Sequence, residues 1–309
     1  MSARKDNTAD RGLALVNALV LVAALSAVAV LLLQLAQGSR LRQVTTQEVT
    51  QATAYLDGLE LLVISQLDAD RARGPVDHLN EAWAKTGSAD VPIDRGRGRY
   101  DITDLSGKFS LGWISGGDVL FGIEAYESLL AAAGLSADLG TEIREFASAQ
   151  GPRDLQPYLQ QTPPVRPRGG VEILPQLQQV SGMTPAAYAR FAQLFTAVRT
   201  EGVVNVNTAP AAVLAAVLPE LSASEVAGLV ETRRDTPFES TEALHGELAR
   251  LLGEEKSEEF DFSPYGVSSH WFGARISVTL GQTRLTRQVV LERSGETGKT
   301  KAIFRFAEN

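Results

Sequence analysis

The feature that most limits how this chain can fold is an uncharged apolar run over residues 13–35. Its only polar side chains are those of Asn17, Ser26 and Gln34. A helix of about 20 apolar residues crosses a membrane core of about 30 Å, so this run is long enough to span a bilayer. We therefore predict a membrane-spanning helix over residues 13–36, with the rest of the chain forming a body on the other side of the membrane.

Three interpretations of this run differ in where the chain is cut. A secretory signal has an apolar run of about 7–15 residues followed by a small-residue cleavage site, whereas here the run is longer and residues 36–40 (AQGSR) hold no such site. An uncut signal anchor is the second interpretation. In the third, a charged leader over residues 1–12 ends at Gly12 and is removed before Leu13. This layout resembles that of type IV prepilin signals.

The prepilin resemblance implies what happens at the start of the helix. A peptidase would cleave between Gly12 and Leu13 on the cytoplasmic side, and the new amine of Leu13 would be methylated. The most frequent proteins of this class have Glu at the fifth position after the cut, which Asn17 occupies here. The amide of Asn17 forms hydrogen bonds but cannot pair with an amine as a carboxylate does.

Basic residues on either side of the run indicate its orientation. Arg4, Lys5 and Arg11 precede it, and Arg40 and Arg42 follow it. This small excess favours a cytoplasmic N-terminus under the positive-inside rule. The body would then lie in the periplasm of a Gram-negative cell, or outside in another type of envelope.

The composition argues against several functions. The chain has 309 residues and a net charge of −8, so a nucleic-acid partner, which needs a basic footprint, is not expected. It has no Cys, which excludes a disulfide framework and a thiolate site, and only three His. The Gly-x-Ser-x-Gly, His-Glu-x-x-His and P-loop motifs do not occur. We expect a protein that is not an enzyme and requires no cofactor, with a membrane-anchored enzyme as a weaker alternative.

Beyond the membrane segment the pattern stays helical. Apolar residues recur at spacings of three and four over residues 41–63, and the first proline is Pro75. We expect one long helix from the membrane to about residue 70, because Gly74-Pro75 is a strong breaker. Two helices with a break near Gly38 are the alternative.

The next region has the features of a hairpin. Residues 99–105 and 108–111 are expected to form two strands joined by a turn at residues 106–107 (SG). Asp101 and Asp104 lie in the first of these strands. Two carboxylates in such a place could suggest a metal site, but we expect them to serve turn chemistry and a solvated face.

The middle of the chain is predicted to be helical, and the end to form strands. Helices are expected over residues 122–133, 137–149, 185–198, 210–217, 223–233 and 241–252. The proline-rich residues 162–170 form an extended connector, and the acidic residues 254–259 are expected to be a loop. From residue 267 the period drops to two, with a hairpin at residues 281–282, and residues 302–306 either add a last strand or fray.

This order predicts an α+β fold. A long N-terminal membrane-spanning helix would pack on an antiparallel sheet, and a large all-helical domain of the helix-hairpin-helix or SAM-like type would be inserted between strands. The predicted segments are a leader at 1–12, the transmembrane part of the helix at 13–36, its periplasmic part at 37–73, first strands at 74–115, the inserted helical domain at 116–253, and C-terminal strands with a tail at 254–309.

Residues 202–238 have the pattern of a helix-hairpin-helix pair, in which Ser222 or Ser224 caps the second helix. Modules of this kind bind DNA when the hairpin carries Gly-x-Gly, because bare backbone N–H groups must approach the phosphate. Here residues 219–222 (PELS) contain no Gly, and Glu220 adds a negative charge. DNA binding is therefore not expected, and a membrane-anchored helix-hairpin-helix protein for DNA binding or uptake is kept as the alternative.

Several stretches, in this order along the chain, resemble the K-type minor pseudopilins of type II secretion. They are Arg11-Gly12 with the apolar run, residues 101–111 (DITDLSGKFSL), 180–191 (VSGMTPAAYARF), 204–209 (VNVNTA) and 262–278. The resemblance covers nearly the whole length and implies a pseudopilin fold with pilin-like strands. It also implies a place at the tip of the periplasmic pseudopilus, where the protein supports or limits assembly for export of folded proteins across the outer membrane. Members of this family lack Glu at the position of Asn17.

The same resemblance implies partners, a location and an ion. The partners would be the I-type and J-type minor pseudopilins, the major pseudopilin, the prepilin peptidase and the inner-membrane assembly platform. The chain would cross the inner membrane once, with a cytoplasmic N-terminus and a periplasmic body, and reach the pseudopilus tip on assembly. Some members bind Ca²⁺, for which Glu258, Glu259 and Asp261 are the candidate ligands here. A solvated acidic loop is the alternative.

Overall fold

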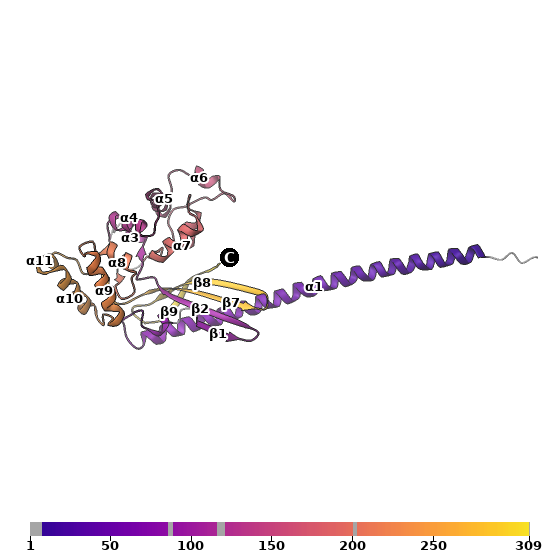
Figure 1. Cartoon of the computed structure of the whole chain (residues 1–309), viewed down its shortest axis with the longest axis horizontal. Helices are drawn as coiled ribbons and strands as arrows, with labels where there is room; N and C mark the ends of the chain where they lie inside the picture. The colour runs from indigo at the N-terminus through magenta and orange to yellow at the C-terminus, as the bar shows by residue number, and fades with distance from the viewer. Residues whose placement is uncertain (1–7, 86–88, 116–120, 200–202, 309) are drawn as a thin grey trace, which may run out of the picture.

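A computed structural model describes residues 8–85, 89–115, 121–199 and 203–308. Its first element is one helix, α1 (Thr8–Arg71), which continues past Gly38, so the single long helix is confirmed and the two-helix alternative is wrong. The segment Leu15–Gln34 has the length and composition to cross a membrane, and none of it is buried against the body. In Figure 1 the first half of α1 projects from the body as a free rod.

Five strands form one antiparallel sheet in the order β1-β2-β7-β8-β9. Their bounds are β1 (Ala89–Ile93), β2 (Gly96–Asp104), β7 (Trp271–Leu280), β8 (Thr283–Arg293) and β9 (Thr300–Ala307). β2 and β7 are neighbours, with Asp101 opposite Arg275, so the strands before and after the helical domain pair as predicted. β7 and β8 meet at the predicted hairpin, and β9 is the final strand. The predicted α+β class is confirmed.

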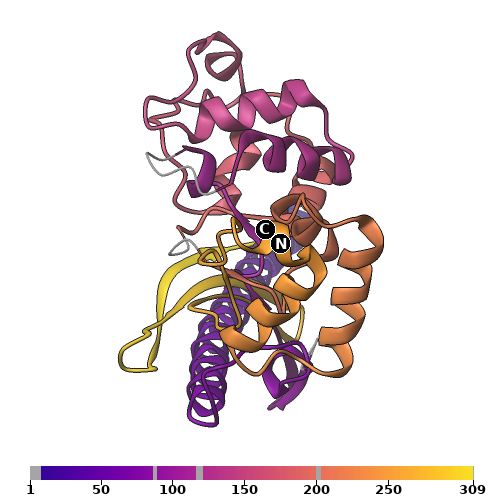
Figure 2. The same ribbon diagram turned by 90° about the vertical axis from the view of Figure 1, so that its left-hand side faces the viewer.

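α1 packs along one face of this sheet because both elements carry apolar stripes of their own period. On β7 every second residue from Phe272 to Leu280 is buried. The buried apolar residues of α1 recur every three or four positions and are Ala52, Leu56, Leu59, Val63 and Leu67. Figure 2 looks nearly along α1 and shows the strands beside the helix, with the magenta and pink helices of the middle of the chain above them.

Ion pairs fasten the same face of α1 to β8 and β9. The buried carboxylate of Glu60 accepts a hydrogen bond from Arg305 Nη2 at 2.6 Å and another from Arg287 Nη1 at 3.1 Å. Arg287 Nη1 also lies 2.7 Å from a carboxylate oxygen of Asp57. A buried carboxylate is costly unless it is paired, so these contacts favour one position of the strands along the helix axis.

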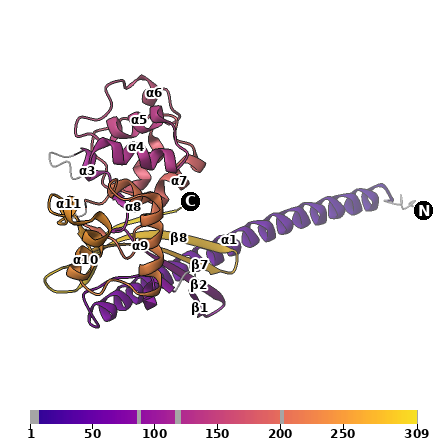
Figure 3. The same cartoon turned by 60° about the vertical axis from the view of Figure 1, so that its left-hand side comes forward.

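The chain between β2 and β7 forms a helical domain with its own apolar core. Its helices are α3 (Gly112–Ser115), α4 (Ile123–Ala132), α5 (Ala137–Ala147), α6 (Gln156–Leu159), η1 (Leu174–Gln179), α7 (Pro185–Leu194), α8 (Ala211–Val217), α9 (Ala223–Asp235), α10 (Thr241–Leu252) and α11 (Glu254–Ser257). A short helix, α2 (Ala82–Lys85), follows α1. Figures 1 and 3 place α8–α11 at the end of the body opposite the anchor and α3–α7 above the sheet.

One predicted strand pairing is wrong. Phe109–Ser110 (β3) does not fold back onto β2 but pairs in parallel with Phe195–Thr196 (β4). The cause is the aromatic side chain of Phe109, whose ring centroid lies 5.7 Å from that of Phe195 inside the core of the helical domain. The same pairing ends the helix predicted over residues 185–198 at Leu194, because Phe195 is already extended.

Two smaller features complete the helical domain. Residues 254–257, predicted as loop, form the single-turn helix α11. Val204–Asn205 (β5) pairs in parallel with Tyr265–Gly266 (β6), which brings the predicted VNVNTA stretch beside the start of the C-terminal strands.

Replacing Leu67 by Ala tests the packing of α1 on the sheet. Leu67 is fully buried, so the variant is expected to lose about 2–5 kcal/mol in the free energy of unfolding. Leu61→Ala is the control, because Leu61 is 67% exposed on the same helix and its loss should change stability by less than about 0.5 kcal/mol. Urea unfolding followed by Trp fluorescence measures both. Equal losses would contradict the assignment of the buried face.

Candidate functional site

The first candidate site is the start of α1. The helix begins at Thr8, so the predicted cleavage site between Gly12 and Leu13 lies in helical backbone continuous with the anchor. Asn17 is exposed one turn further on, about 6 Å along the axis from Leu13. Positions four apart share one helix face, so the Asn17 amide would lie near an amine created at Leu13. Cleavage and methylation stay predictions.

The second candidate site is a buried polar cluster where the end of α1, the sheet and the helical domain meet. We call it the junction, and its members are Asp77, Asp104, Asn205, Thr208, Ser269 and Arg293. They come from the loop after α1, the end of β2, the VNVNTA stretch, the residues before β7 and the end of β8. Segments distant in sequence therefore converge on one set of hydrogen bonds.

Asp104 is the centre of this junction. One carboxylate oxygen accepts hydrogen bonds from the hydroxyls of Thr208 and Ser269, each at 2.5 Å, and from the Asn205 amide at 3.2 Å. The other oxygen accepts the backbone N–H of Ser106 at 2.7 Å. Burial raises the pKa of Asp104 to about 6, although these hydrogen bonds act to lower it. The expectation that Asp104 lies on a solvated face is wrong, whereas Asp101 is exposed.

Arg293 joins the end of β8 to the loop after α1. Its Nη2 donates to both carboxylate oxygens of Asp77, at 2.5 and 2.6 Å, and to the carbonyl of Ser269 at 2.7 Å. Asp77 in turn accepts the backbone N–H of Ser269 at 2.7 Å. The guanidinium also lies 4.8 Å from the ring centroid of Phe272. Because both charges are buried, removing either partner would leave an uncompensated charge in the interior.

The VNVNTA stretch is held by its own side chains. The Asn205 amide donates to the carbonyl of Asp77 at 3.1 Å and to the hydroxyl of Ser269 at 2.7 Å. The Asn207 side chain makes two hydrogen bonds with the backbone of Phe238, at 2.9 and 3.0 Å. From α9 the buried Arg233 donates to the carbonyls of Val206 and Ala209, and burial lowers its pKa to about 10.

The sequence contained a signal for the junction that motif reasoning did not use. Asp104, Asn205, Thr208 and Ser269 all fall within stretches that carry the family resemblance. Two adjacent polar residues before β7 contact this cluster: Ser269 donates to Asp104, and His270 Nδ1 lies 3.2 Å from the carbonyl of Arg293. The cluster therefore fixes the relative placement of the sheet and the helical domain.

Among the described residues, one acidic group has ligand atoms close enough together to hold a metal ion. It consists of Asp70, Asp77 and Glu81, whose oxygens all lie within 4.8 Å of one another. Its charge is already balanced in part by Arg293, whose Nη1 lies 3.9 Å from Asp70. Glu81 is also engaged, because it accepts the backbone N–H of His78 and the indole N–H of Trp83.

The predicted calcium ligands are arranged differently. Glu258, Glu259 and Asp261 are exposed at the end of α11 and just beyond it. Asp261 accepts the backbone N–H of Ser263 at 2.9 Å, and the side chain and the backbone N–H of Ser263 together lower the pKa of Asp261. In the described structure these three do not form a group with three oxygens in mutual reach, so as placed they do not fit a calcium ion. Calcium binding stays a prediction.

Helices α8 and α9 form the helix-hairpin-helix pair, and Ser222 rather than Ser224 caps the second helix. The Ser222 hydroxyl accepts the N–H of Glu225, while the Glu225 carboxylate accepts the N–H of Ser222. Residues 218–262 contain twelve acidic and four basic residues. The net charge of this segment is therefore −8, the same as that of the whole chain. This end of the helical domain would repel a phosphate backbone.

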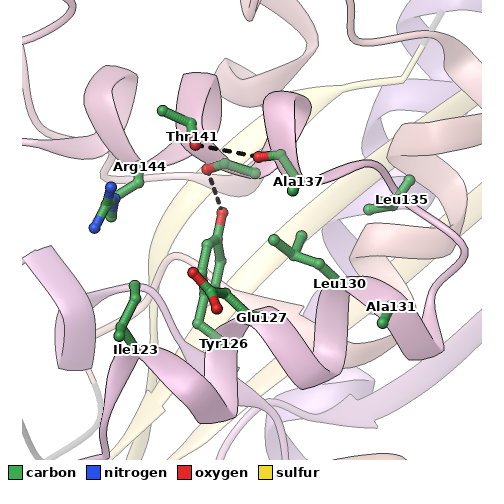
Figure 4. Close-up of a pocket in the computed structure, with 10 residues that line it drawn as sticks. Ile123, Tyr126, Glu127, Leu130, Ala131, Leu135, Ala137, Thr141 and Arg144 are labelled. Atoms are coloured by element: carbon green, nitrogen blue, oxygen red, sulfur yellow. Dashed lines mark hydrogen bonds between the residues drawn. The ribbon is translucent and has the colours of Figure 1, made fainter.

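A pocket of about 220 Å³ lies between α4 and α5 (Figure 4). The two helices approach closely at Gly140, whose carbonyl accepts a hydrogen bond from the Tyr126 hydroxyl at 2.8 Å. Glu127 and Arg144 are its charged lining residues. The lining is otherwise mostly apolar.

Comparison with known proteins identifies relatives over nearly the full length. The family described as type II secretion system (T2SS), protein K, matches residues 204–262. Two proteins named type II secretion system protein K are similar throughout. The protein from Pseudomonas aeruginosa is 29% identical and the alignment covers 96% of this chain and 92% of the relative. The protein from Klebsiella pneumoniae is 27% identical, with 94% and 95% covered.

A solved structure shares the fold. In the crystal structure of the GspK-GspI-GspJ complex from the enterotoxigenic Escherichia coli type 2 secretion system, one chain aligns with a TM-score of 0.69 and 19% identity. The alignment covers 87% of this chain and 99% of that chain. Together with the sequence relatives, this likeness confirms the resemblance to the K-type proteins.

The acidic group beside Arg293 predicts a pH dependence of stability. The pKa of Asp70 is raised to about 6, first by burial and then by the charges of Glu81 and Asp77. Its contribution to stability is therefore complete below its ordinary pKa near 3.8 and is lost as the pH rises through about 6. Asn cannot ionise, so Asp70→Asn avoids the stability that the unmodified chain loses when Asp70 ionises. The variant is therefore expected to melt at a higher temperature than the unmodified chain at pH 7.5.

The difference in melting temperature should shrink as the pH falls below about 6. Asp104 titrates in both proteins and so cancels in the comparison. Melting curves followed by circular dichroism between pH 4.5 and 7.5 measure the effect. A difference that does not vary with pH would contradict the assignment.

Proposed function

We propose that this chain, a minor pseudopilin of the K type in the type II secretion system, forms the tip of the periplasmic pseudopilus. There it would support or limit pseudopilus assembly for export of folded proteins across the outer membrane. The observation that carries the proposal is the similarity to protein K over almost the whole chain. The apolar part of α1 fits a membrane-anchored protein with a periplasmic body.

Two structural features support the tip position. Helices α8–α11 cover the end of the body opposite the anchor, as Figure 3 shows, so they would hinder a further subunit from stacking there. In filaments of this class, Glu at the fifth position is thought to neutralise the amine of the subunit above. Asn17 cannot do so, and a subunit at the tip has nothing above it to neutralise.

The start of the chain supports a defined route to that position. Prepilin peptidase would cut between Gly12 and Leu13, and the new amine of Leu13 would be methylated. The basic residues before the anchor favour a cytoplasmic N-terminus in the inner membrane. The assembly platform of that membrane would then draw the subunit out together with the major pseudopilin.

The nearest partners would be other minor pseudopilins. The solved relative is part of a complex of GspK, GspI and GspJ, and we propose that this chain binds its own I-type and J-type proteins. The role is structural rather than enzymatic, in keeping with a family that is a component of the secretion machinery. Calcium binding by Glu258, Glu259 and Asp261 is a separate proposal, and no step above depends on it.

The DNA-uptake alternative is not favoured. The hairpin between α8 and α9 carries Glu220 and no Gly, and the surrounding segment holds the excess negative charge of the chain. The similar proteins from Pseudomonas aeruginosa and Klebsiella pneumoniae are both named as secretion proteins.

The mature N-terminus tests the prepilin route. Protein recovered from membranes is expected to begin at Leu13 and to carry one methyl group on its amine, as shown by N-terminal sequencing and intact mass. Gly12→Glu should block the cut and leave the leader attached, whereas Ala14→Ser, a change on the other side of the cut, should not. A chain beginning at Met1 or after residue 36 would overturn the route.

The position in the filament tests the tip proposal. An epitope-tagged chain co-expressed with the major pseudopilin is expected to label only filament ends in immunogold electron microscopy. Asn17→Glu separates the two supports of the proposal. Label along the shaft would show that the missing carboxylate limits growth, because the new carboxylate can neutralise the next subunit's amine, whereas label confined to the ends would show that the helical domain limits it. Gln34→Glu adds the same charge elsewhere in the segment and should leave the label at the ends. Shaft labelling by the unmodified chain would contradict the proposal.

A further inference from the structure

The outer face of the sheet is hollowed at the ends of its two hairpins. The hollow has a volume of about 430 Å³ and lies on the face that points away from α1. Its lining residues are Arg95, Gly96, Arg97, Arg99, Ser277, Thr279, Gly281 and Arg284. By strand register Arg97, Arg99 and Arg284 share this face with the hydroxyl residues Ser277 and Thr279. Arg95 lines the rim from the β1–β2 turn. None of them belongs to the junction or to the start of α1.

The strand register arranges part of this lining in a row. Arg97 of β2 is opposite Thr279 of β7, and Thr279 is opposite Arg284 of β8. Directly opposed residues on neighbouring strands point to the same face, and the strands are about 4.8 Å apart. The Thr279 hydroxyl is therefore flanked by two arginines whose backbones are about 10 Å apart.

The arginines of the hollow exceed their carboxylate partners. Asp90 is shared, because it pairs with Arg99 and also lies 3.7 Å from Arg97. Asp94 lies 3.7 Å from Arg95. Among the described residues, no carboxylate lies within ion-pair distance of Arg284. Asp90 thus serves both Arg97 and Arg99, while Arg284 has only the longer-range attraction of Glu308, which itself pairs with Arg275. The side chains of Arg95 and Arg97 are 72% and 62% exposed.

The backbone at Arg95 is strained. Arg95 has φ 57°, and it is the only residue other than Gly with positive φ in the described ranges. This conformation costs a residue with a Cβ roughly 1–2 kcal/mol relative to the right-handed region. It is kept here at a two-residue turn, where Arg95 also donates to Gln51 of α1 at 3.1 Å. Strain that persists in a folded protein often marks a functional position.

The hollow lies at the membrane side of the body. Figure 1 shows both hairpin ends beside α1 where the anchor leaves the body, and Thr283 donates to Glu48 of α1 there at 2.9 Å. Glu48 is about 21 Å along the helix from Gln34, the end of the apolar segment. Membrane helices tilt by about 20° on average and up to about 40°, which brings one side of the body toward the headgroups. The negatively charged segment 218–262 lies at the end of the body opposite the anchor.

We propose that this hollow binds a phosphate group, and that the headgroup of an anionic phospholipid supplies it while the subunit rests in the membrane. Guanidinium forks match phosphate oxygens in geometry and charge, and the hydroxyl of Thr279 adds a donor between them. The phosphodiester of such a lipid carries one negative charge, which offsets part of the excess positive charge of the arginines around the hollow. The site would hold the body inclined on the bilayer, with its acidic end away from the surface.

Hydrogen exchange on the full chain in nanodiscs tests this site. The amides of the β1–β2 turn and of the start of β8 are expected to exchange about five-fold more slowly in discs containing phosphatidylglycerol than in pure phosphatidylcholine. A third sample adds inorganic phosphate to the phosphatidylcholine discs. The double variant Arg97→Gln, Arg284→Gln should lose the protection. The control is Arg234→Gln, Arg250→Gln, which removes the same charge from exposed positions in the acidic half.

Each outcome decides the proposal. Protection by phosphatidylglycerol that is lost only in the Arg97/Arg284 variant supports a lipid phosphate site. Protection by inorganic phosphate as well supports the phosphate chemistry and identifies a free anion as a second source. The proposal is overturned if neither sample shows protection, or if the control variant loses it equally. Unchanged exchange in the core strands of both variants establishes that they are folded.

Discussion

The buried contact between Arg293 and Asp77 is the interaction on which the rest of this structure depends. It joins the last long strand to the loop that follows the membrane helix, and through Ser269 and Asp104 it reaches the entry to the helical domain. Buried charges of this kind are less a source of stability than a requirement for one arrangement, since any other packing would leave them unpaired. The anchor, the sheet and the helical domain therefore have one relative placement.

The helical domain is an insertion that leaves the sheet intact, because the strands before and after it pair with each other. β2 and β7 pair along their whole length, so the sheet is continuous although the chain leaves it after Asp104 and returns at Trp271. The hydrophobic cores of the two parts are separate, and the polar junction lies where the chain passes between them. A large domain can thus be carried on the end of a pilin-like body without altering how the body holds its helix.

The sequence made local features predictable and left long-range ones open. α1 and the β7–β8 hairpin follow from the apolar period and from Gly281-Gln282, both of which act between near neighbours in the chain. β3 could not be assigned in this way, because its partner is chosen by the aromatic core around Phe195 rather than by its own turn. Asp104 shows the same limit. The pattern predicted turn chemistry for Asp104, which its hydrogen bond from Ser106 fits, but its burial depends on Thr208 and Ser269. Among the candidate sites, only that of Asn17 follows from local spacing alone, because Asn17 is the fifth residue after the predicted cut.

The unbroken course of α1 has a mechanical consequence. A helix of 64 residues is a rod about 96 Å long, and a pull on its membrane end is transmitted along its axis without a hinge to absorb it. The load then passes into the sheet through side contacts that lie parallel to the pull, among them Glu60 with Arg287 and Arg305. Contacts arranged in this way are loaded in shear and share the force, instead of opening one after another. A force on the membrane end of α1 can therefore push or pull the whole body as one rigid unit.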